Sequence, residues 1–179
     1  AIIYTSGTSS QPKGVMLTHY NLCSQLYMID KLFMVYPEDI FLSILPLAHT
    51  YECTIGLILA FYHGCHVVYL DKAPTVSILL PALKEVRPTI MLTVPLIIEK
   101  IFRGAVLKKF TSSAIMRALY GVGFIRKMLH RVAGKTLTKT FGGRVRFFGI
   151  GGAKLDSTVE QFLLDAKFIY DIGYGLTET

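Results

Sequence analysis

Residues 53–70 read CTIGLILAFYHGCHVVYL, and this stretch decides the fold class. Its eighteen residues include no Asp, Glu, Lys or Arg, a length at which an apolar helix can cross a bilayer. However, His63 and Gly64 interrupt the stretch in the middle, and His66 follows closely. The first half matches a buried helix, and the second half, short and rich in β-branched residues, is typical of a buried strand. The stretch therefore predicts a helix that stops at Gly64 and then a strand, rather than a membrane span.

The same alternation of strand and helix runs through the rest of the chain. Short apolar runs bounded by turn residues indicate strands, and apolar residues three and four apart indicate helices. Repeated strand–helix–strand units predict an α/β fold in which helices flank a mostly parallel sheet, and such sheets bind ligands at the carboxyl ends of their strands. We predict strands over residues 1–4, 40–45, 65–70, 89–94, 145–150 and 168–172, helices over residues 18–32, 51–62, 76–86, 95–102, 113–133 and 157–164, and the loosest stretch over residues 134–140.

The composition of the 179 residues excludes several classes of protein. With 52% hydrophobic and 17% charged residues, the chain is neither disordered nor fibrous. Three cysteines without a Cys-x-x-Cys pair are too few for a disulfide scaffold, so we expect a reducing compartment, the cytoplasm. The chain opens on Ala1 inside a predicted strand and ends at Thr179 without a helix stop, so we expect it to be part of a longer protein.

The net charge of +7 is unevenly distributed. Twelve basic residues and no acidic residue lie from Lys100 to Arg146, whereas the rest of the chain holds seven basic and twelve acidic residues. Such a run suggests phosphates, an acidic membrane surface or nucleic acid as a neighbour. Within it, Lys127, Arg131 and Lys135 are four residues apart and share one helical face, which fits either a basic amphipathic surface or a solvated face. We expect this face to lie opposite an apolar stripe of Ile115, Leu119, Val122, Ile125, Leu129 and Val132.

A polar segment follows the first predicted strand, where residues 4–14 read YTSGTSSQPKG. Hydroxyls and free backbone N–H groups bind phosphate oxygens, and Lys13 adds a point charge. The segment is not a P-loop, because Pro12 stands where glycine precedes the lysine and Gly14 stands where Ser or Thr would bind Mg²⁺. Phosphate binding and an ordinary polar loop both stay open on these residues alone.

A second polar segment, LPLAHTYE at residues 45–52, follows another predicted strand. His49 and Glu52 are three residues apart at the start of a helix, so they can share a face. Glu52 also suits a helix N-terminus without any further role, because the helix dipole favours a carboxylate there.

The last two segments are rich in glycine. Residues 149–155, GIGGAKL, contain adjacent glycines that let the backbone approach a flat ligand closely. Residues 173–179, GYGLTET, offer Tyr174 to stack on a base, Thr177 to donate to a phosphate and Glu178 to bind Mg²⁺. Each segment alone also fits an ordinary turn.

Together, the four segments resemble the motifs of the adenylate-forming superfamily, which includes acyl-CoA synthetases, luciferases and the adenylation domains of peptide synthetases. Residues 4–14 resemble its phosphate loop, with Ser9 in place of Thr and Ser10 in place of Gly. Order and spacing also agree, so the resemblance covers essentially the whole chain. The other matches are Leu45–Glu52 to a motif containing Pro-Leu-x-His, Gly151–Leu155 to Gly-Gly-Ala-Pro-Leu with Lys154 for Pro, and Tyr174–Glu178 to Tyr-Gly-x-Thr-Glu.

Within the superfamily, the chain is most similar to long-chain fatty acyl-CoA synthetases, through residues 87–89, 94–100, 142–146 and 174–179. The resemblance implies that residues 1–179 are a central fragment of the large N-terminal AMP-binding domain, with the C-terminal lid domain absent. The complete enzyme would convert a long-chain fatty acid and ATP to acyl-adenylate and pass the acyl group to coenzyme A, whereas the fragment would be inactive. Another adenylate former, luciferase-like or amino-acid-activating, and a non-enzymatic phosphate- or nucleic-acid-binding module are the alternatives.

The resemblance also implies roles for the matching residues, with ATP, Mg²⁺ and coenzyme A as cofactors and no nucleic acid as partner. Glu178 would bind Mg²⁺, Thr177 would contact the α-phosphate, and His49 would lie by the acyl carboxylate. Peripheral contact with an acidic membrane on its inner face is compatible with the basic run, and the oligomeric state stays open. Thr5, Ser6, Gly7, Thr8, Ser9, Ser10 and Lys13 would hold the β- and γ-phosphates, and Gly151, Gly152, Ala153, Tyr174 and Gly175 would surround the adenine.

Overall fold

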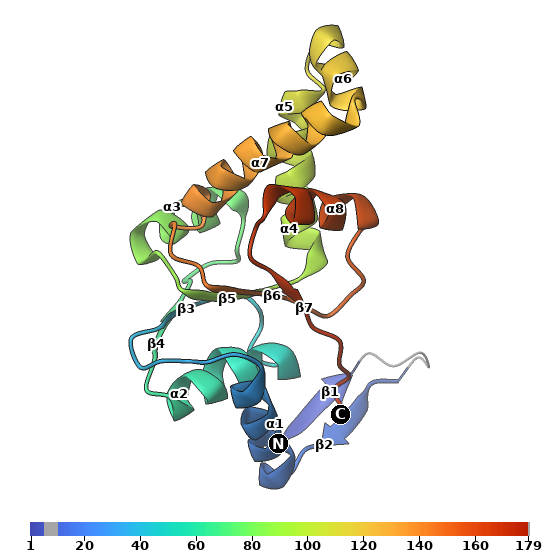
Figure 1. Ribbon diagram of the computed structural model, residues 1–179. Helices are drawn as coiled ribbons and strands as arrows, with labels where there is room; N and C mark the ends of the chain where they lie inside the picture. Colours follow the sequence, from blue (N-terminus) through green and yellow to red (C-terminus); the bar gives the residue numbers. More distant parts are fainter. Residues whose placement is uncertain (6–10, 179) are drawn as a thin grey trace.

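The computed structural model describes residues 1–5 and 11–178, which form a parallel sheet with helices on both faces (Figure 1). The sheet has the strand order β4-β3-β5-β6-β7, and β1 and β2 form a separate antiparallel ribbon. The prediction of an α/β fold with a mostly parallel sheet and flanking helices is confirmed. The strands are β1 (Ile2–Thr5), β2 (Lys13–Met16), β3 (Ile40–Ser43), β4 (His66–Tyr69), β5 (Ile90–Thr93), β6 (Phe147–Ile150) and β7 (Asp171–Ile172).

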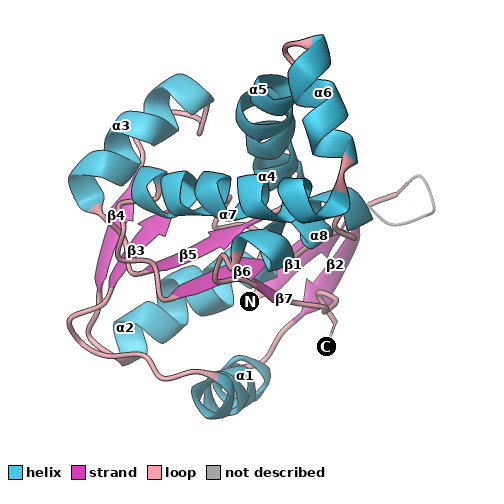
Figure 2. Cartoon of the chain, turned by 45° about the horizontal axis from the view of Figure 1, so that its top comes forward, coloured by secondary structure: helices cyan, strands magenta, loops and turns pink. Residues whose placement is uncertain are grey.

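Helices cover the sheet on each side, with α1 and α2 below it and α3, α4, α7 and α8 above it in the view of Figure 1. Figure 2 shows α7 lying across this upper layer, where it packs along α8. The helices are α1 (His19–Leu32), the π-helix η1 (Glu52–Leu59) continuing into α2 (Ala60–Tyr62), α3 (Val76–Val86), α4 (Pro95–Ile101), the π-helix η2 (Phe102–Leu107), α5 (Lys108–Phe110), α6 (Ala114–Gly121), α7 (Gly123–Thr140) and α8 (Ser157–Ala166).

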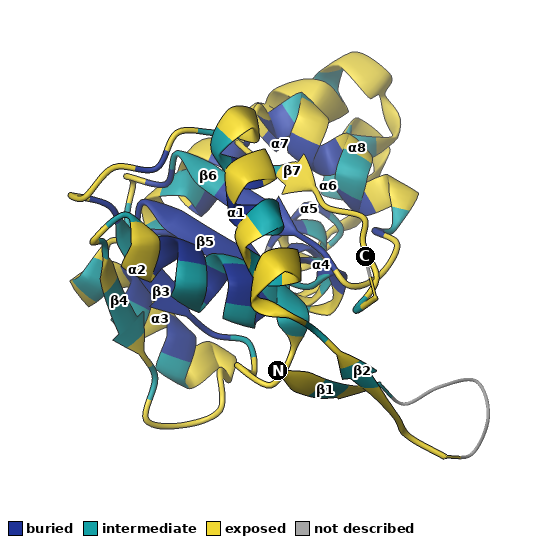
Figure 3. Ribbon diagram, turned by 90° about the horizontal axis from the view of Figure 1, so that it is seen from below, coloured by how far each residue is buried: buried dark blue, intermediate teal, exposed yellow. Residues whose placement is uncertain are grey.

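Two hydrophobic cores form because successive side chains of a strand point to opposite faces of the sheet. Phe41 of β3 and Ile90 of β5 pack into the smaller core with Leu26 of α1. The next residues along the same strands, Leu42 and Met91, pack into the larger core beneath α3, α4, α7 and α8. The strands β3 and β5 are therefore buried on both faces, as the dark blue ribbons of Figure 3 show.

The stretch of residues 53–70 folds as predicted, as a helix followed by the strand β4. Gly64 takes a φ of +69°, a left-handed conformation that glycine adopts without strain, and the helix stops there. Within residues 1–5 and 11–178, no helix is both long enough and apolar enough to cross a membrane.

The start of α1 is also confirmed. Thr18 caps it, because its Oγ1 accepts a hydrogen bond from the backbone N–H of Asn21 at 3.1 Å. The Asn21 side chain in turn accepts from the backbone N–H of Thr18 at 2.9 Å, which closes a capping box.

The prediction for residues 113–140 is wrong in two respects. The helix breaks at Val122 into α6 and α7, and residues 134–140, predicted as the loosest stretch, are the last turns of α7. Burial explains the longer helix, since Leu137 lies in the larger core. Gly134 permits the close contact with α8: a Cβ atom on Gly134 would lie 2.5 Å from the carbonyl oxygen of Ala166.

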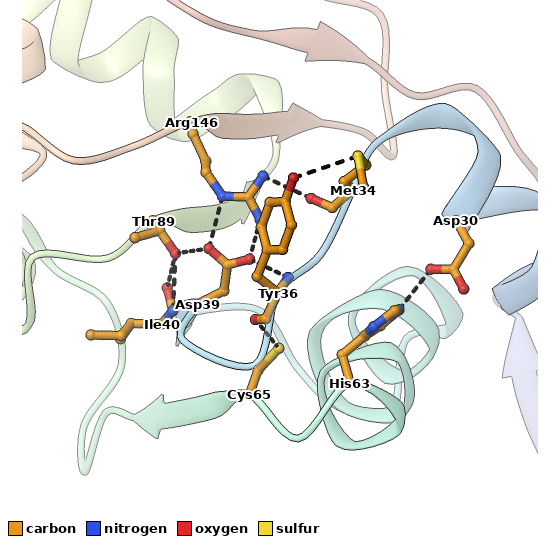
Figure 4. Close-up of polar contacts among 9 residues, drawn as sticks. All are labelled: Asp30, Met34, Tyr36, Asp39, Ile40, His63, Cys65, Thr89 and Arg146. Carbon is orange, nitrogen blue, oxygen red and sulfur yellow. Dashed lines mark hydrogen bonds and ion pairs between the residues drawn. The ribbon is translucent and has the colours of Figure 1, made fainter.

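A polar cluster ties the amino ends of three central strands together (Figure 4). Asp39, which precedes β3, accepts hydrogen bonds from Thr89 Oγ1 at 2.7 Å, from the Tyr36 backbone N–H at 2.8 Å, and from Arg146 Nε at 2.8 Å. Arg146 also donates to the carbonyl oxygen of Met34 at 2.7 Å. Burial opposes ionisation of Asp39, but the hydrogen bonds from Arg146, Tyr36 and Thr89 outweigh it and lower the pKa of the carboxyl. This cluster is therefore a structural ion pair at the edge of the sheet opposite to the carboxyl ends.

Candidate active site

The predicted motif segments meet the sheet at one edge, because all five strands run parallel. Residues 44–52 follow β3, residues 151–155 follow β6, and residues 173–178 follow β7. Backbone hydrogen bonds join neighbouring strand ends: Gly151 N–H donates to the Thr93 carbonyl at 3.0 Å, and Gly173 N–H donates to the Ile150 carbonyl at 2.9 Å. Three of the four segments thus leave the same edge of the sheet, where open α/β folds bind ligands.

Tyr51 packs against the glycine-rich end of β6. A Cβ atom on Gly149 would lie 2.5 Å from the Tyr51 hydroxyl oxygen, and one on Gly151 would lie 3.1 Å from Tyr51 Cζ. These two glycines therefore make room for a side chain of the protein itself. Burial, and then the charge of Glu52, raise the pKa of the Tyr51 hydroxyl, so the phenol stays protonated. The sequence does not reveal this contact, because its partners lie far apart in the chain.

The turn that follows Gly151 is open to solvent. Gly152 and Ala153 are exposed. Gly152 has a φ of +84°, a left-handed conformation that favours glycine at this position. The turn after β6 thus presents a bare backbone at the carboxyl edge of the sheet.

Glu52, expected either to share a face with His49 or to suit a helix N-terminus, is instead a buried carboxyl. Its side chain is 1% exposed, and its Oε1 accepts a 2.5 Å hydrogen bond from Ser43 Oγ at the end of β3. Oε2 is buried without a hydrogen-bond partner among the described residues. Burial raises the pKa of Glu52 to about 7, although the bond from Ser43 acts in the opposite direction. Gly56 leaves room for the carboxyl, since a Cβ atom there would lie 2.5 Å from Oε1.

His49 does not share a face with Glu52, although their spacing allowed it. His49 is exposed, and its Nδ1 accepts a hydrogen bond from the Tyr51 backbone N–H at 3.2 Å. The His49 side chain therefore faces solvent at the edge of the sheet, whereas the Glu52 side chain is buried.

The segment after β7 descends from the sheet toward the β1–β2 ribbon (Figure 1). Tyr174 is 94% exposed, Gly175 and Glu178 are exposed, and Thr177 is half-buried. These side chains are accessible to a ligand.

The ribbon holds the two ends of the predicted phosphate loop. Thr5 at the end of β1 pairs with Lys13 at the start of β2, and Lys13 is exposed. The strand β2 is not predicted by the sequence pattern, which reads as a polar loop up to Gly14. The loop residues between them, Ser6, Gly7, Thr8, Ser9 and Ser10, lie outside the described residues.

In the part of the chain that the structure describes, the acidic residues form no preassembled metal cage. Across residues 1–5 and 11–178, no group of three or more His, Cys, Asp or Glu side chains comes together. Glu178 offers an exposed carboxylate in the segment after β7. This donor fits Mg²⁺ carried by a nucleotide, because that ion keeps several waters and takes one or two protein carboxylates plus phosphate oxygens.

Sequence comparisons identify relatives along the full chain. The family model described as AMP-binding enzyme matches residues 1–179. Long chain acyl-CoA synthetase 7, peroxisomal, of Arabidopsis thaliana is 33% identical over 194 residues, which cover 99% of this chain and 27% of the relative. Fatty acyl-CoA synthetase B of Dictyostelium discoideum is 30% identical over 193 residues, which cover 99% of this chain and 28% of the relative. The chain thus spans little more than a quarter of the length of these relatives.

Solved structures share the fold. The N-terminal domain of FACL13 from Mycobacterium tuberculosis matches with a TM-score of 0.69 and 22% identity, over 99% of this chain and 36% of that one. O-succinylbenzoate coenzyme A synthetase from Bacillus subtilis, in complex with AMP, matches with a TM-score of 0.71 and 20% identity, over 99% of this chain and 30% of that one. The family match over every residue, together with this fold, confirms the resemblance seen in the motifs: the chain belongs to the family of AMP-binding enzymes.

Proposed function

We propose that the full-length protein containing this chain activates a long-chain fatty acid with ATP and transfers the acyl group to coenzyme A. The observation that carries the proposal is the gathering of three motif segments at the carboxyl edge of one parallel sheet. The names of the curated relatives, long-chain and fatty acyl-CoA synthetases, support the substrate class. The reducing compartment inferred from the cysteines supports a cytoplasmic enzyme.

In the first step, a carboxylate oxygen of the fatty acid attacks the α-phosphorus of ATP, and pyrophosphate leaves. Two anions must be brought together, so the main tasks of the protein are positioning and stabilisation of charge on the phosphate. Lys13 and the loop of residues 5–10 would hold the β- and γ-phosphates, and Thr177 would donate to the α-phosphate. His49, exposed beyond β3, would bind the acyl carboxylate.

Glu178 would hold Mg²⁺ together with phosphate oxygens of the nucleotide. Held there, Mg²⁺ would supply charge neutralisation and polarisation at the phosphoryl oxygens. Glu178 lies next to Thr177 in the chain, so the two would act on the same triphosphate.

The adenine would lie against the exposed backbone of Gly152 and Ala153, with the exposed ring of Tyr174 on its other side, while Gly151 is buried against Tyr51. Tyr51 would support this surface from beneath, because its ring packs against Gly149 and Gly151. A flat ligand and a flat backbone surface give contact over a wide area without a side chain in between.

In the second step, the thiol sulfur of coenzyme A attacks the acyl carbonyl carbon, the thiol proton is lost, and AMP leaves with the former carboxylate oxygen. AMP is a much better leaving group than the oxide that a free carboxylate would release. Activation therefore makes thioester formation accessible.

The test is acyl-CoA formation by the full-length protein with fatty acids of graded length. We expect AMP, pyrophosphate and acyl-CoA, with long-chain acids preferred by kcat/KM. A higher kcat/KM with short-chain fatty acids would contradict the proposed preference for long-chain acids. Adenylation of amino acids, or oxygen-dependent light emission, would indicate another adenylate-forming enzyme.

A further inference from the structure

The outward face of α7 combines apolar and basic side chains that the fold leaves uncovered. Phe124, Met128 and Val132 are 81%, 52% and 60% exposed. Five exposed cations lie along the same helix, and four of them are on or beside the side of these apolar residues. We call these seven residues the α7 surface: Phe124, Lys127, Met128, Arg131, Val132, Lys135 and Lys139.

Helix geometry places the two kinds of side chain beside one another. His130, Gly134 and Leu137 are buried and define the inner face of α7. At 100° per residue, Phe124, Met128 and Val132 form a stripe on the opposite side. Arg131, Lys135 and Lys139 lie within or directly beside this stripe, and Lys127 lies between the stripe and the inner face. Arg126, the fifth cation of α7, lies on the other side of the helix and is not part of this surface.

This arrangement corrects the expected apolar stripe of residues 115–132. Val132, Val122 and Ile115 are 60%, 50% and 75% exposed, so these residues do not face the core. Only Ile125 and Leu129 of that stripe are half-buried in α7.

Within residues 1–5 and 11–178, no acidic side chain forms an ion pair with a cation of the α7 surface. The segment from Lys100 to Arg146 contains no Asp or Glu. Among the described residues, the ion pairs involve His63, Arg103, His130 and Arg146, and none includes a cation of the α7 surface. A partner that covers this surface must therefore supply negative charge.

We propose that the α7 surface binds the surface of an anionic lipid bilayer, with Phe124, Met128 and Val132 in the headgroup–acyl boundary and the cations against lipid phosphates. Anionic lipid satisfies both halves of the surface, because basic residues attract the headgroups and apolar side chains enter the acyl region. Nucleic acid would satisfy only the cations. A second copy of the chain would place its own positively charged α7 surface against this one, and the like charges would repel.

The place of α7 in the fold agrees with this orientation. Figure 1 shows α7 on the outer side of the upper helical layer, with the β1–β2 ribbon on the other side of the sheet. A bilayer on the α7 surface therefore leaves the ribbon in contact with water. The inference stands on charge and exposure, and it does not depend on the proposed reaction.

Vesicle flotation of the full-length protein tests the proposal. We expect binding to vesicles of phosphatidylcholine with phosphatidylglycerol, weaker binding in high salt, and no binding to phosphatidylcholine alone. Each cation near an anionic membrane is worth about fivefold in partitioning, so the triple variant Lys127→Glu, Arg131→Glu, Lys135→Glu should lower it by at least about tenfold. The control Lys31→Glu, Lys72→Glu, Lys84→Glu makes the same charge change elsewhere and should leave most of the binding.

Two further variants separate charge, apolar contact and folding. The exchange Lys127→Arg, Arg131→Lys, Lys135→Arg keeps the charge and should bind as the wild type does. The variant Phe124→Ser, Met128→Ser, Val132→Ser keeps every charge and should still lose at least about tenfold, through loss of apolar burial. Equal binding to neutral vesicles, or equal loss in both charge-reversal variants, would overturn the proposal. So would an apolar variant that binds like the wild type, which would point to nucleic acid or another purely electrostatic partner.

Discussion

At the residue scale, Glu52 links the pH to the stability of the fold. Its folded pKa is about 7, against an ordinary value of 4.5, because the carboxyl is buried. Between these two values the unfolded chain releases the proton and the folded chain keeps it, so the free energy of unfolding falls as the pH rises. Above pH 7 both states are ionised, and the slope from this group disappears.

We therefore expect Glu52→Gln to remove that pH dependence. The difference in the free energy of unfolding, variant minus wild type, should rise by on the order of 3 kcal/mol from pH 4.5 to pH 7.5. Urea unfolding across this pH range measures the difference. The exposed Glu85→Gln should keep the wild-type slope, and a Glu52→Gln slope equal to that of the wild type would refute the buried neutral carboxyl.

Arg146 is the second residue whose loss has a definite consequence. Asp39 is 2% exposed, so removal of its guanidinium partner leaves a buried charge without compensation. We expect Arg146→Ala to lower the free energy of unfolding by about 3 kcal/mol. The exposed neighbour Arg144 serves as control, and Arg144→Ala should change stability by less than about 0.5 kcal/mol. Equal effects of the two substitutions in urea titrations would contradict the role of the ion pair.

Glu178 carries the proposed metal contact. In the full-length protein, Glu178→Ala should reduce Mg²⁺-dependent ATP–pyrophosphate exchange by about 100-fold or more, since one electrostatic contact to the reacting phosphates is lost. Glu85→Ala removes an exposed carboxylate on α3 and should leave exchange unchanged. Exchange that survives in Glu178→Ala at the wild-type rate would end this assignment.

At the scale of elements, the packing of α7 on α8 depends on Gly134. Gly134→Ala raises helix propensity, but its Cβ atom would lie 2.5 Å from a backbone oxygen of α8, so the helices must separate. We expect a loss of about 1–3 kcal/mol in thermal or urea unfolding. Gly104→Ala in η2 meets no atom within 4 Å and should be neutral or stabilising. A neutral Gly134→Ala would show that the two helices are not closely packed.

The same contact shows what sequence patterns can and cannot predict. The helix α1 and the strand β5 are visible locally, because a cap residue and a continuous apolar run mark them. The last turns of α7 are not visible locally. Leu137 is buried by elements from other parts of the chain, and Gly134 alone indicates the end of a helix.

At the scale of the whole molecule, strand order explains which parts of the site were predictable. The positions of residues 45–52, 151–155 and 174–178 after strands could be read from the sequence, and parallel pairing then brings them to one edge. The packing of Tyr51 against Gly149 and the burial of Glu52 could not be predicted in this way. Both depend on which residues lie next to β3 and β6 in the folded protein.

The fate of the carboxylate oxygen tests the central claim most directly. The full-length protein is supplied with long-chain fatty acid labelled with ¹⁸O in both carboxyl oxygens, ATP, Mg²⁺ and coenzyme A, and the products are analysed by mass spectrometry. An acyl-adenylate intermediate predicts one ¹⁸O in each AMP, none in pyrophosphate, and one in the acyl-CoA carbonyl. Formation of ADP with ¹⁸O in inorganic phosphate would show an acyl-phosphate route instead and would contradict the account.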